Sequence, residues 1–558
     1  MWRRTISHFF ARVSWLVWLV GLVACTAVTE ATVTPADRVV TEEGTAAATP
    51  HTPTGSSWYD IGNPTLTDLW VDPVNGDDTN SGASRNEALS TLIEAWARIP
   101  PGVPLNTTGY HLQLVAGTYD PAIVPVYWES RYGTFPFPIL IESADGPGAA
   151  HLPALNIYDT RYLYLLGLHI SAGGGDVFHC EQCDHLLLRQ VTVLGADPGT
   201  FNVQETVKIN QSSHVYLELS DFSGAWDNAI DFVAVQYGHI RGNFIHNAGD
   251  WCHYVKGGSA YFRVEGNTYF DCGTGGFTTG QGTGFEFMTS PWLHYEAYDI
   301  KFVNNVLHDI EGACMGVNGG YNILLAYNTC YRTGERSHVL EVVFGLRSCD
   351  GNTAQCNAYL GAGGWGTAVT GGEEPIPDRN VYIYNNIFYN PAGYQSQWQH
   401  LAIYGPRPTS PGSNIPNPAQ TDTNLHIRGN VIWNGPANHP LGIEGSDQGC
   451  QPTNPTCNQT QLLAENHINT FEPELADPAN GDFQVPENSN LLTATTFAAA
   501  DFTWTNLPAL PVVPPGDPDN SVPVDFRGRV RLHTSPPGAF GEPALVNNFV
   551  YLAMVAGE

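Results

Sequence analysis

The sequence predicts an all-β fold, a single-stranded right-handed parallel β-helix solenoid with an N-terminal capping helix and loop inserts. Two observations favour it. A short strand-like unit, with apolar residues on both sides of Gly-Asn or Asn-Asn, recurs along the chain, and self-similarity at a fixed period is typical of solenoids. Few stretches show the 3.6-residue apolar period of an amphipathic helix, which argues against a helical solenoid.

The repeated unit has a period that fits one coil of a β-helix. Where no insert intervenes, its Asn or Asp recurs after 22 to 24 residues, as between Asn243 and Asn267. We expect this residue at a turn, where asparagine tolerates a left-handed conformation and stacks as a side-chain ladder. The copies are residues 165–170, 219–222, 240–245, 264–269, 302–307, 325–330, 383–388 and 427–432.

A solenoid also needs a cover over its first coil. Residues 86–99 place Leu89, Leu92, Ile93 and Trp96 on one face of a predicted amphipathic helix, which we expect to serve as this cap. The β-helix domain is expected to span residues 58–541.

The N-terminus predicts export. Residues 1–24 combine arginines with a short apolar run, as a signal peptide does. Cys25 directly follows Leu-Val-Ala and resembles the lipidated cysteine of a bacterial lipobox; an ordinary secretory signal with an incidental cysteine is the alternative. Residues 25–57, rich in Thr, Ala and Pro, are predicted to form a disordered tether. We therefore expect the protein at the bacterial cell surface or otherwise outside the cell, touching the membrane through a lipid anchor only. Residues 542–558 form an apolar tail of open role.

The composition limits the partners. A net charge of −31 argues against nucleic acid, because phosphate binding needs a basic surface. An acidic extracellular protein suits Ca²⁺ better, although such charge can also serve solubility alone. The oligomeric state is left open by the sequence.

Cysteine usage agrees with an oxidising compartment. Setting Cys25 aside leaves ten cysteines, an even number. Cys349 with Cys356, and Cys450 with Cys457, are predicted to be local disulfides. Cys180 and Cys183 form a CxxC for which a disulfide, free thiols and a zinc site all stay open. The pairing of the others stays open too: Cys252, Cys272, Cys314 and Cys330.

Aligning the coils on the turn asparagine stacks polar residues into one column. The column is predicted to contain Asn210, Phe232, Lys256, Gln281 and Asn318. Strand alternation is expected to turn Phe232 and Val255 inward, and Asp231, Tyr254 and Lys256 outward. Four acids on neighbouring coils are candidate Ca²⁺ ligands: Asp221, Asp227, Asp231 and Asp250.

Two segments resemble the ends of known bacterial β-helix proteins. Residues 70–82 resemble the entry segment of right-handed β-helices of the pectate-lyase type, and residues 525–528 with 537–541 resemble their closing segment. The resemblance covers residues 68–541 and implies an architecture rather than an activity.

The surroundings of Lys256 resemble polysaccharide lyases of families nine and six. In those enzymes a lysine on one coil is the base and neighbouring acids hold Ca²⁺, which implies these roles for Lys256 and the four acids. Tyr254 and His253 are further catalytic candidates on the same strand. Alginate-lyase-like members carry an arginine on the next coil, and here that coil has Thr278-Thr279-Gly280-Gln281. This departure puts alginate as the substrate in doubt.

An aromatic insert, residues 283–298, interrupts the repeat beside Lys256. Trp292, Tyr295 and His294 are candidate substrate-binding residues, with Gln281 and Asn318 of the column, because aromatic faces stack on sugars. These aromatics can equally pack the insert onto the sheet. His294 with Glu286 or Glu296 is an acid–base arrangement for a hydrolase.

The sequence thus favours an exported protein that cleaves an acidic polysaccharide by Ca²⁺-assisted β-elimination, with a lysine base. A glycoside hydrolase that uses carboxylates on the same face is one alternative. A non-catalytic glycan-binding or adhesion solenoid is the other.

Overall fold

The computed structural model describes residues 58–541 except 173, 198, 201 and 533, and all of them belong to one compact unit. The predicted signal peptide, Cys25, the tether and the C-terminal tail lie outside the described residues. Over the described part of the chain, no helix has the length and apolarity needed to cross a membrane.

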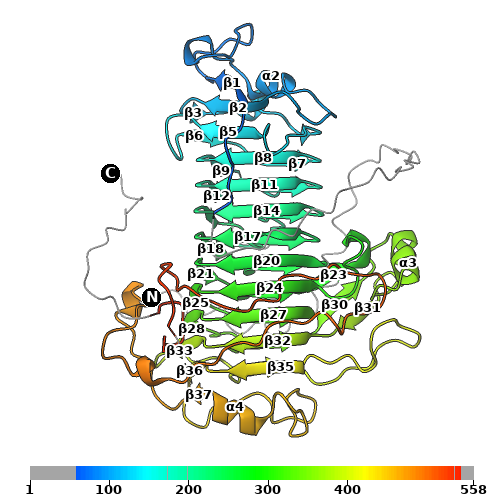
Figure 1. Cartoon of the computed structure of the whole chain (residues 1–558), viewed down its shortest axis with the longest axis vertical. Helices are drawn as coiled ribbons and strands as arrows, with labels where there is room; N and C mark the ends of the chain where they lie inside the picture. The colour runs from blue at the N-terminus through cyan, green and yellow to red at the C-terminus, as the bar shows by residue number, and fades with distance from the viewer. Residues whose placement is uncertain (1–57, 173, 198, 201, 533, 542–558) are drawn as a thin grey trace. The chain divides into compact units, whose positions relative to one another are not determined.

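The described chain is a right-handed parallel β-helix, as predicted. Each coil adds one strand in turn to sheet A, sheet B and sheet C, and every pairing within these three sheets is parallel (Figure 1). Sheet A contains β1 (Leu66–Val71), β2 (Gly109–Leu114), β5 (Ile139–Ser143), β8 (Arg161–Leu166), β11 (Asp184–Arg189), β14 (Ser213–Glu218), β17 (Gln236–Arg241), β20 (Ser259–Glu265), β24 (Ala297–Val303), β27 (Gly320–Ala326), β32 (Arg379–Tyr384) and β35 (Thr423–Arg428).

The other two long sheets use shorter strands. Sheet B contains β3 (Gly117–Thr118), β6 (Ala150–Leu152), β9 (His169–Ser171), β12 (Thr192–Leu194), β15 (Asp221–Ser223), β18 (Phe244–Ala248), β21 (Thr268–Cys272), β25 (Val306–Ile310), β28 (Thr329–Thr333), β33 (Ile387–Asn390), β36 (Val431–Asn434) and β37 (His467–Ile468). Sheet C contains β4 (Trp128–Glu129), β7 (Leu155–Tyr158), β10 (Phe178–Glu181), β13 (Val207–Asn210), β16 (Ile230–Val233), β19 (Trp251–Lys256), β22 (Gly275–Gly280), β26 (Ala313–Asn318), β29 (Leu340–Val343) and β34 (Leu401–Ile403).

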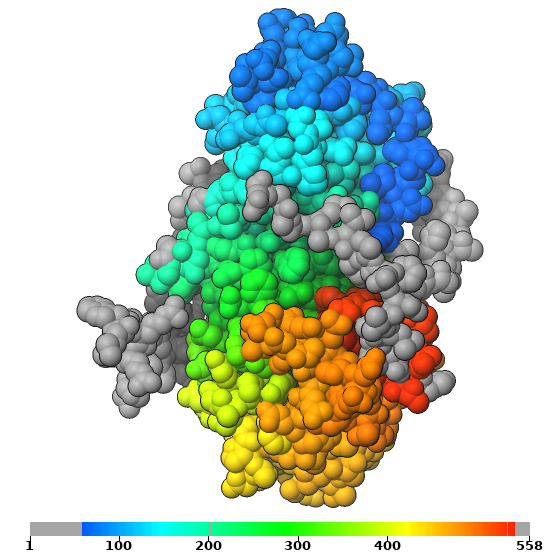
Figure 2. Space-filling model, turned by 90° about the vertical axis from the view of Figure 1, so that its left-hand side faces the viewer, coloured from blue at the N-terminus to red at the C-terminus, as the bar shows by residue number. Residues whose placement is uncertain are grey.

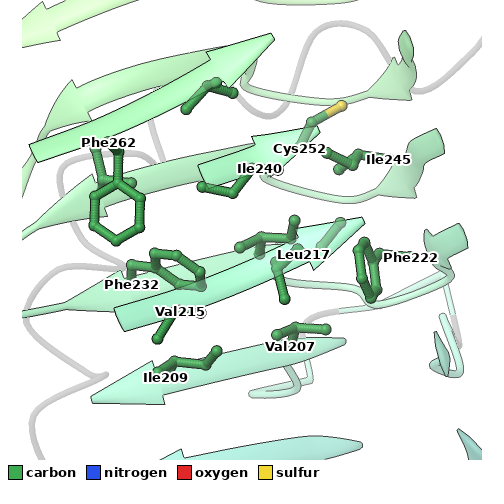
Figure 3. Packing of buried hydrophobic residues seen from close by; sticks show 14 of the residues in the cluster. Val207, Ile209, Val215, Leu217, Phe222, Phe232, Ile240, Ile245, Cys252 and Phe262 are labelled. Atoms are coloured by element: carbon green, nitrogen blue, oxygen red, sulfur yellow. The ribbon is translucent and has the colours of Figure 1, made fainter. Parts of the chain in front are cut away.

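The core is a continuous apolar column inside the coils. Alternate residues of each strand point inward, and the same position on successive coils stacks (Figure 3). Phe232 and Val255 are fully buried in this column, as predicted from the alternation. The three sheets therefore share one hydrophobic interior, and residues at the intervening positions face outward.

A buried asparagine ladder runs between sheets A and B. Each member accepts hydrogen bonds from the backbone N–H and side-chain amide of the member before it, as Asn305 does from Asn267 at 3.0 Å in both cases. The ladder comprises Asn243, Asn267, Asn305, Asn328, Asn386, Asn430 and Asn466. The predicted stacking is confirmed, and Asn466 adds a member that the repeat alone did not reveal.

The left-handed conformation falls one residue earlier than predicted. Positive φ angles occur at Gly242, Gly266 and Asn304, each directly before a ladder asparagine. This arrangement leaves the ladder side chain pointing into the turn, where it satisfies buried backbone groups, while glycine or a second asparagine takes the strained position.

The N-terminal cap is shorter than predicted. Helix α2 spans Leu92–Ala97 and buries Leu92 and Trp96 over the first coil, and η2 (Arg85–Glu87) precedes it. Leu89 is buried in a bridge to Val71 rather than in a helix, and Ile93 is exposed. The prediction of one helix over residues 86–99 is wrong because Leu89 completes the strand layer instead.

All ten cysteines of the described residues form disulfides. The predicted Cys349–Cys356 and Cys450–Cys457 bonds are present, and Cys180–Cys183 is a disulfide rather than a zinc site or free thiols. The remaining bonds are Cys252–Cys272 and Cys314–Cys330. The first joins β19 of sheet C to β21 of sheet B, and the second joins β26 of sheet C to β28 of sheet B. Both bonds therefore connect two adjacent walls of the solenoid.

Loops on the C-terminal coils cover sheet A and the corner between sheets C and A. They carry η4 (Phe285–Phe287), α3 (Thr353–Gly361) and a small sheet of β23 (Gly282–Gly284), β30 (Gly345–Ser348) and β31 (Glu373–Ile376). After α4 (Gln459–Glu465) the chain turns back along the solenoid (Figures 1 and 2). Lys301 of sheet A holds this return segment through the carbonyl oxygens of Asp517 and Asp519.

Residues 525–541, which resemble the closing segment of other β-helices, lie against sheet B. The rings of Phe526 and Phe540 pack together at 5.0 Å, in a cluster with Val306 and Tyr331 of sheet B. The segment therefore covers the side of the solenoid, and it does so because those sheet B strands present apolar side chains outward.

We predict that Asn305→Ala lowers the free energy of unfolding by about 3 kcal/mol or more, because several buried backbone and amide groups lose their partner at once. Urea unfolding followed by circular dichroism measures this. The control is Asn357→Ala, whose amide donates only within exposed helix α3. Equal losses in the two variants would contradict a structural role for the ladder.

Candidate functional site

The outward positions of sheet C form two polar columns. The first column, which we call the Tyr254 column, contains His179, Lys208, Asp231, Tyr254 and Thr278. The second, the Lys256 column, contains Glu181, Asn210, Val233, Lys256, Gly280 and Asn318. The predicted column is confirmed for Asn210, Lys256 and Asn318. At the other two positions the prediction is wrong by one residue, because Val233 and Gly280 occupy the column in place of Phe232 and Gln281. Phe232 points inward, and Gln281 follows the strand.

Lys208 and Lys256 occupy neighbouring columns, two coils apart, in different surroundings. The Nζ of Lys208 lies 3.1 Å from Asp231 Oδ2 and 3.7 Å from Glu205 Oε1. The Nζ of Lys256 instead donates to the Tyr254 hydroxyl and to Gln281 Oε1, both at 3.2 Å. Among the described residues, Lys256 has no carboxylate oxygen within 4.0 Å. Lys208 is thus held in an ion pair, whereas Lys256 is held by neutral groups.

Carboxylates gather at the turn between sheets B and C, beside the start of these strands. Asn228 connects them: its side-chain amide donates to Asp227 at 2.9 Å, to Glu205 at 3.3 Å and to the Tyr254 hydroxyl at 3.1 Å. Its backbone N–H donates to Glu205 at 2.8 Å. Asp250 lies on the next coil, with its N–H donating to the carbonyl of Asp227.

The cluster drives its carboxyl pKa values apart. Burial raises the pKa of Asp227 to about 7, and the charges of Asp250 and Asp231 add to the effect. Burial also raises the pKa values of Glu205 and Asp250. For Asp231 burial acts in the same direction, but the charges of Lys208 and Lys256 outweigh it and the pKa is lowered.

The two other ionisable groups of the cluster follow the same physics. Burial would lower the pKa of Lys208, but Asp231 and Glu205 outweigh it and the pKa is raised. Burial, together with the charge of Asp231, raises the pKa of the Tyr254 hydroxyl far above its ordinary value. Tyr254 is therefore a neutral hydrogen-bonding group at neutral pH, and Lys208 is a fixed cation.

The predicted acid set is not one cluster. Asp221 belongs to β15 of sheet B, where His246 Nε2 lies 3.2 Å from its carboxylate. Sheet B faces a different side of the solenoid from sheet C, which carries Asp231. The prediction that Asp221 shares a Ca²⁺ site with the other acids is therefore wrong. Asp227, Asp231 and Asp250 are near one another, although their carboxylate oxygens do not all lie within 4.8 Å.

His253 is wrong as a catalytic residue. It alternates with Tyr254 and points into the solenoid, where its ring lies 5.0 Å from Phe277 and 5.8 Å from Phe232. It is fully buried, and burial lowers its pKa to about 3. A neutral imidazole enclosed by aromatic rings has no route to substrate.

The aromatic insert packs the sheet more than it lines a site. His294 is fully buried, its Nε2 lies 3.0 Å from the carbonyl oxygen of Leu510, and burial lowers its pKa to about 4. Tyr295 is 3% exposed and packs against Tyr321 and Trp365. The prediction that these two bind substrate is wrong. Trp292 is half-buried, and its indole N–H donates to the Tyr261 hydroxyl at 3.0 Å.

The proposed hydrolase pairs with His294 are wrong as well. Glu296 is fully buried and forms an ion pair with Arg347, at 2.6 Å to Nη2 and 2.9 Å to Nε. It also accepts from the backbone N–H of Gly257 at 2.9 Å. Glu286 accepts from the backbone N–H groups of Asp350 and Asn352. Glu296 thus fixes the insert to neighbouring coils, and Glu286 joins two loops to each other.

Glu205, Lys208 and Asn228 were missed by the sequence reasoning. The signal that identifies them is the coil period of 23 residues, which relates 205 to 228, and 208 to 231 and 254. Lys208 lies one coil before Asp231 in the Tyr254 column, whereas the predicted column was that of Lys256. Asn228 also lacks any motif, because its role rests on hydrogen bonds across coils.

We predict that the Asp227 carboxyl makes stability pH-dependent. Its pKa is raised in the folded state, so its stabilising contribution is present below about pH 4 and is lost as the pH rises through 7. In urea unfolding with EDTA, Asp227→Asn should remove a fall of at most about 4 kcal/mol between these limits. Asp221→Asn, on sheet B, should keep it. Identical pH profiles for wild type and Asp227→Asn would contradict the prediction.

Comparisons with known proteins leave the activity open. No family model matches the chain, and no curated protein does. Solved structures that it resembles include a rhamnogalacturonan lyase, at 11% identity and TM-score 0.39, covering 66% of this chain and 87% of that one. A pectate lyase has 15% identity, TM-score 0.32 and coverage of 80% and 95%. A family 6 polysaccharide lyase from Pseudopedobacter saltans has 14%, 0.31 and coverage of 70% and 98%. With all three TM-scores this low, the strand pairing itself establishes the β-helix.

Proposed function

We propose that this protein is an exported cell-surface enzyme that cleaves an acidic polysaccharide by β-elimination, with Lys256 as the base. The observation that carries the proposal is the outward cluster on sheet C, where a lysine free of any carboxylate partner lies beside four carboxylates and an ion-paired second lysine. Export and lipid anchoring rest on residues 1–25 alone.

Lys256 suits the removal of a proton from carbon. Elimination from a uronate requires a base at the carbon next to the carboxylate, and a lysine amine performs this only when neutral. Tyr254 and Gln281 hold the Lys256 amine in place by two hydrogen bonds, and neither is a carboxylate that would form an ion pair with it. Lys208 has the opposite design, because Asp231 and Glu205 stabilise its charged form. Lys208 therefore serves as a fixed cation for the site.

We propose that the acids of the cluster hold a Ca²⁺ ion. Asp231 Oδ1 is buried without a hydrogen-bond partner, and Asp227 and Asp250 repel each other without a lysine in ion-pair contact. Hard oxygen donors of this kind are the ligands that Ca²⁺ prefers. The oxygens of Asp227, Asp231 and Asp250 do not all lie within 4.8 Å of one another, so at least one of the three would hold the ion through a water molecule. When bound, the ion would offset the charge that develops on the substrate carboxylate.

Polar groups on the neighbouring coils are placed to orient a sugar chain. Asn318 lies two coils after Lys256 in the same column, and its Oδ1 accepts from the Thr278 hydroxyl at 3.0 Å. Gln281 bridges to Lys256 from the end of the next strand. We assign both to substrate binding, since each is partly exposed and has further hydrogen-bonding capacity.

One observation favours glycoside hydrolysis as a second candidate. The pKa of Asp227 is raised to about 7 while that of Asp231 is lowered, and two carboxyls with divergent pKa values are the pattern of a proton donor and its partner carboxylate. In this alternative Asp227 donates the proton to the leaving oxygen, and Lys256 only binds. In a glycan-binding solenoid without catalysis, Asp227 and Lys256 would bind the glycan and no product would form.

We predict that Lys256→Ala lowers kcat on a polyuronate substrate by about 10³-fold, the usual contribution of a general base. The assay follows the ultraviolet absorbance of the carbon–carbon double bond that elimination creates, over a panel of polyuronates. Lys256→Arg keeps the charge but cannot deprotonate, so it should be as inactive as Lys256→Ala. Full activity in either variant would contradict the role of Lys256. New reducing ends without absorbance would favour the hydrolase.

We also predict that Ca²⁺ stabilises the folded protein through this cluster. At 100 times its Kd the ion should add about 2.7 kcal/mol to the free energy of unfolding. The gain should vanish in the Asp227→Asn, Asp250→Asn double variant and persist in the control Asp221→Asn. Mg²⁺ should stabilise less, because it dehydrates reluctantly. A Ca²⁺ effect of equal size in the double variant would contradict this site.

A further inference from the structure

The Lys256 column continues beyond the proposed active site to the last strands of sheet C. In register, Asn318 is followed by Val343 of β29, and Ile403 of β34 pairs with Val342. The next position on β34 is therefore Tyr404, whose backbone N–H donates to the Val342 carbonyl. Tyr404 is 36% exposed, so an aromatic ring faces outward on the same corner of the solenoid as Lys256.

Arg407 lies against this ring. Its guanidinium is 4.8 Å from the ring centroid of Tyr404 and 5.0 Å from that of Phe344. Its backbone pairs with Ala419 in both directions, which fixes the base of the side chain. Arg407 is exposed, and within the described ranges no carboxylate oxygen lies within the 4.0 Å of an ion pair. The aromatic faces thus hold a guanidinium whose N–H groups are available to a ligand.

A second exposed aromatic ring precedes β34 in the chain, whereas Tyr404 follows that strand. Trp398 is 53% exposed and lies 5.8 Å from the ring of His338, whose Nε2 is 3.2 Å from Glu341. Glu341 continues the Tyr254 column, in register with Gly316. A side chain at Gly316 would meet Glu341 and Thr278 at about 3 Å, so glycine there allows Glu341 to lie along the sheet.

We propose that Tyr404 and Arg407 form a distal subsite that binds an acidic sugar residue of the same polysaccharide chain whose cleavage we assign to Lys256. The proposal rests on the proposed function and deepens it: Arg407 binds a sugar carboxylate through paired N–H donors, and the exposed ring of Tyr404 packs against a sugar face.

The spacing suits a chain bound along the solenoid axis. From β19 to β34 there are four strand steps, and with strands about 4.8 Å apart this gives a span of about 19 Å, which is several sugar residues. Arg407 supplies a cation on the same corner as Lys256, further along the solenoid axis. A protein with a net charge of −31 needs such local cations to hold a polyanion.

The test measures binding of uronate oligomers to the full chain, silenced by Lys256→Ala, using polygalacturonate and alginate fragments and calorimetry. Arg407→Ala should weaken an octasaccharide by at least about tenfold, the loss of one charge-assisted contact. A trisaccharide, too short to span both sites, should bind equally to both forms. Arg407→Lys should rescue in part, because lysine keeps the charge without the planar fork. The control Arg85→Ala removes an exposed arginine at the N-terminal cap.

Each outcome separates the two proposals. Equal octasaccharide affinity with and without Arg407, or equal losses for Arg85→Ala and Arg407→Ala, would overturn the subsite and leave the role of Lys256 standing. If the wild-type protein formed no double-bond product in the absorbance assay, β-elimination would be overturned. If Arg407→Ala still weakened the octasaccharide but not the trisaccharide, the subsite would stand. Failure of every uronate oligomer to bind would overturn both.

Discussion

The structure depends on a constant coil register, and the buried asparagine ladder enforces it. Each ladder amide satisfies backbone groups of two coils at once, so a coil that gained or lost a residue between sheets A and B would leave buried donors without acceptors. Inserts are therefore confined to other corners, chiefly between sheets C and A. The ladder persists across the two longest inserts, as Asn328 still bonds to Asn386 although 58 residues separate them.

This register is also what assembles the chemistry. With 23 residues to a coil in this region, Lys208, Asp231 and Tyr254 lie on one line of sheet C, and Glu205 and Asn228 lie at equivalent turns of successive coils. Only Glu205 with Lys208 and Asn228 with Asp231 are near each other in sequence, three residues apart in both cases; the coil period brings these pairs together. Burial raises the pKa of Asp227, and the charges of Asp250 and Asp231 add to it. The charges of Lys208 and Lys256 lower the pKa of Asp231, and strands about 4.8 Å apart bring these charges together. Residues one coil period apart in sequence thus become neighbours on sheet C, and their charges form a cluster.

The fold was predictable because the repeat leaves its mark on the sequence, and part of the site was predictable for the same reason. The period and strand alternation were enough to place Lys256, Asn318 and Asp231 on one outward face. The alternation that turned Val255 inward also excludes His253, and extending it by one residue would have removed that candidate. Asp221 was misassigned because coil adjacency alone does not say on which of three sheets a residue lies.

The loops were not predictable in the same way. Glu296 and His294 have the residue types of a hydrolase, but Arg347 and the carbonyl of Leu510 engage them from segments 51 and 216 residues away. Such contacts follow from how inserts fold onto the sheet, and no period relates them. Arg407 and Tyr404 lie beyond a long insert that hides the coil count, so their continuation of the Lys256 column appears only in the strand pairing.

The central claim is that the Lys256 cluster breaks a uronate chain by elimination rather than by adding water. Cleavage of a bound polyuronate in water enriched in heavy oxygen, followed by mass spectrometry of the fragments, tests it most directly. The account predicts that no heavy oxygen enters either new end and that one fragment is lighter by one water. One heavy oxygen incorporated at each broken bond would contradict it.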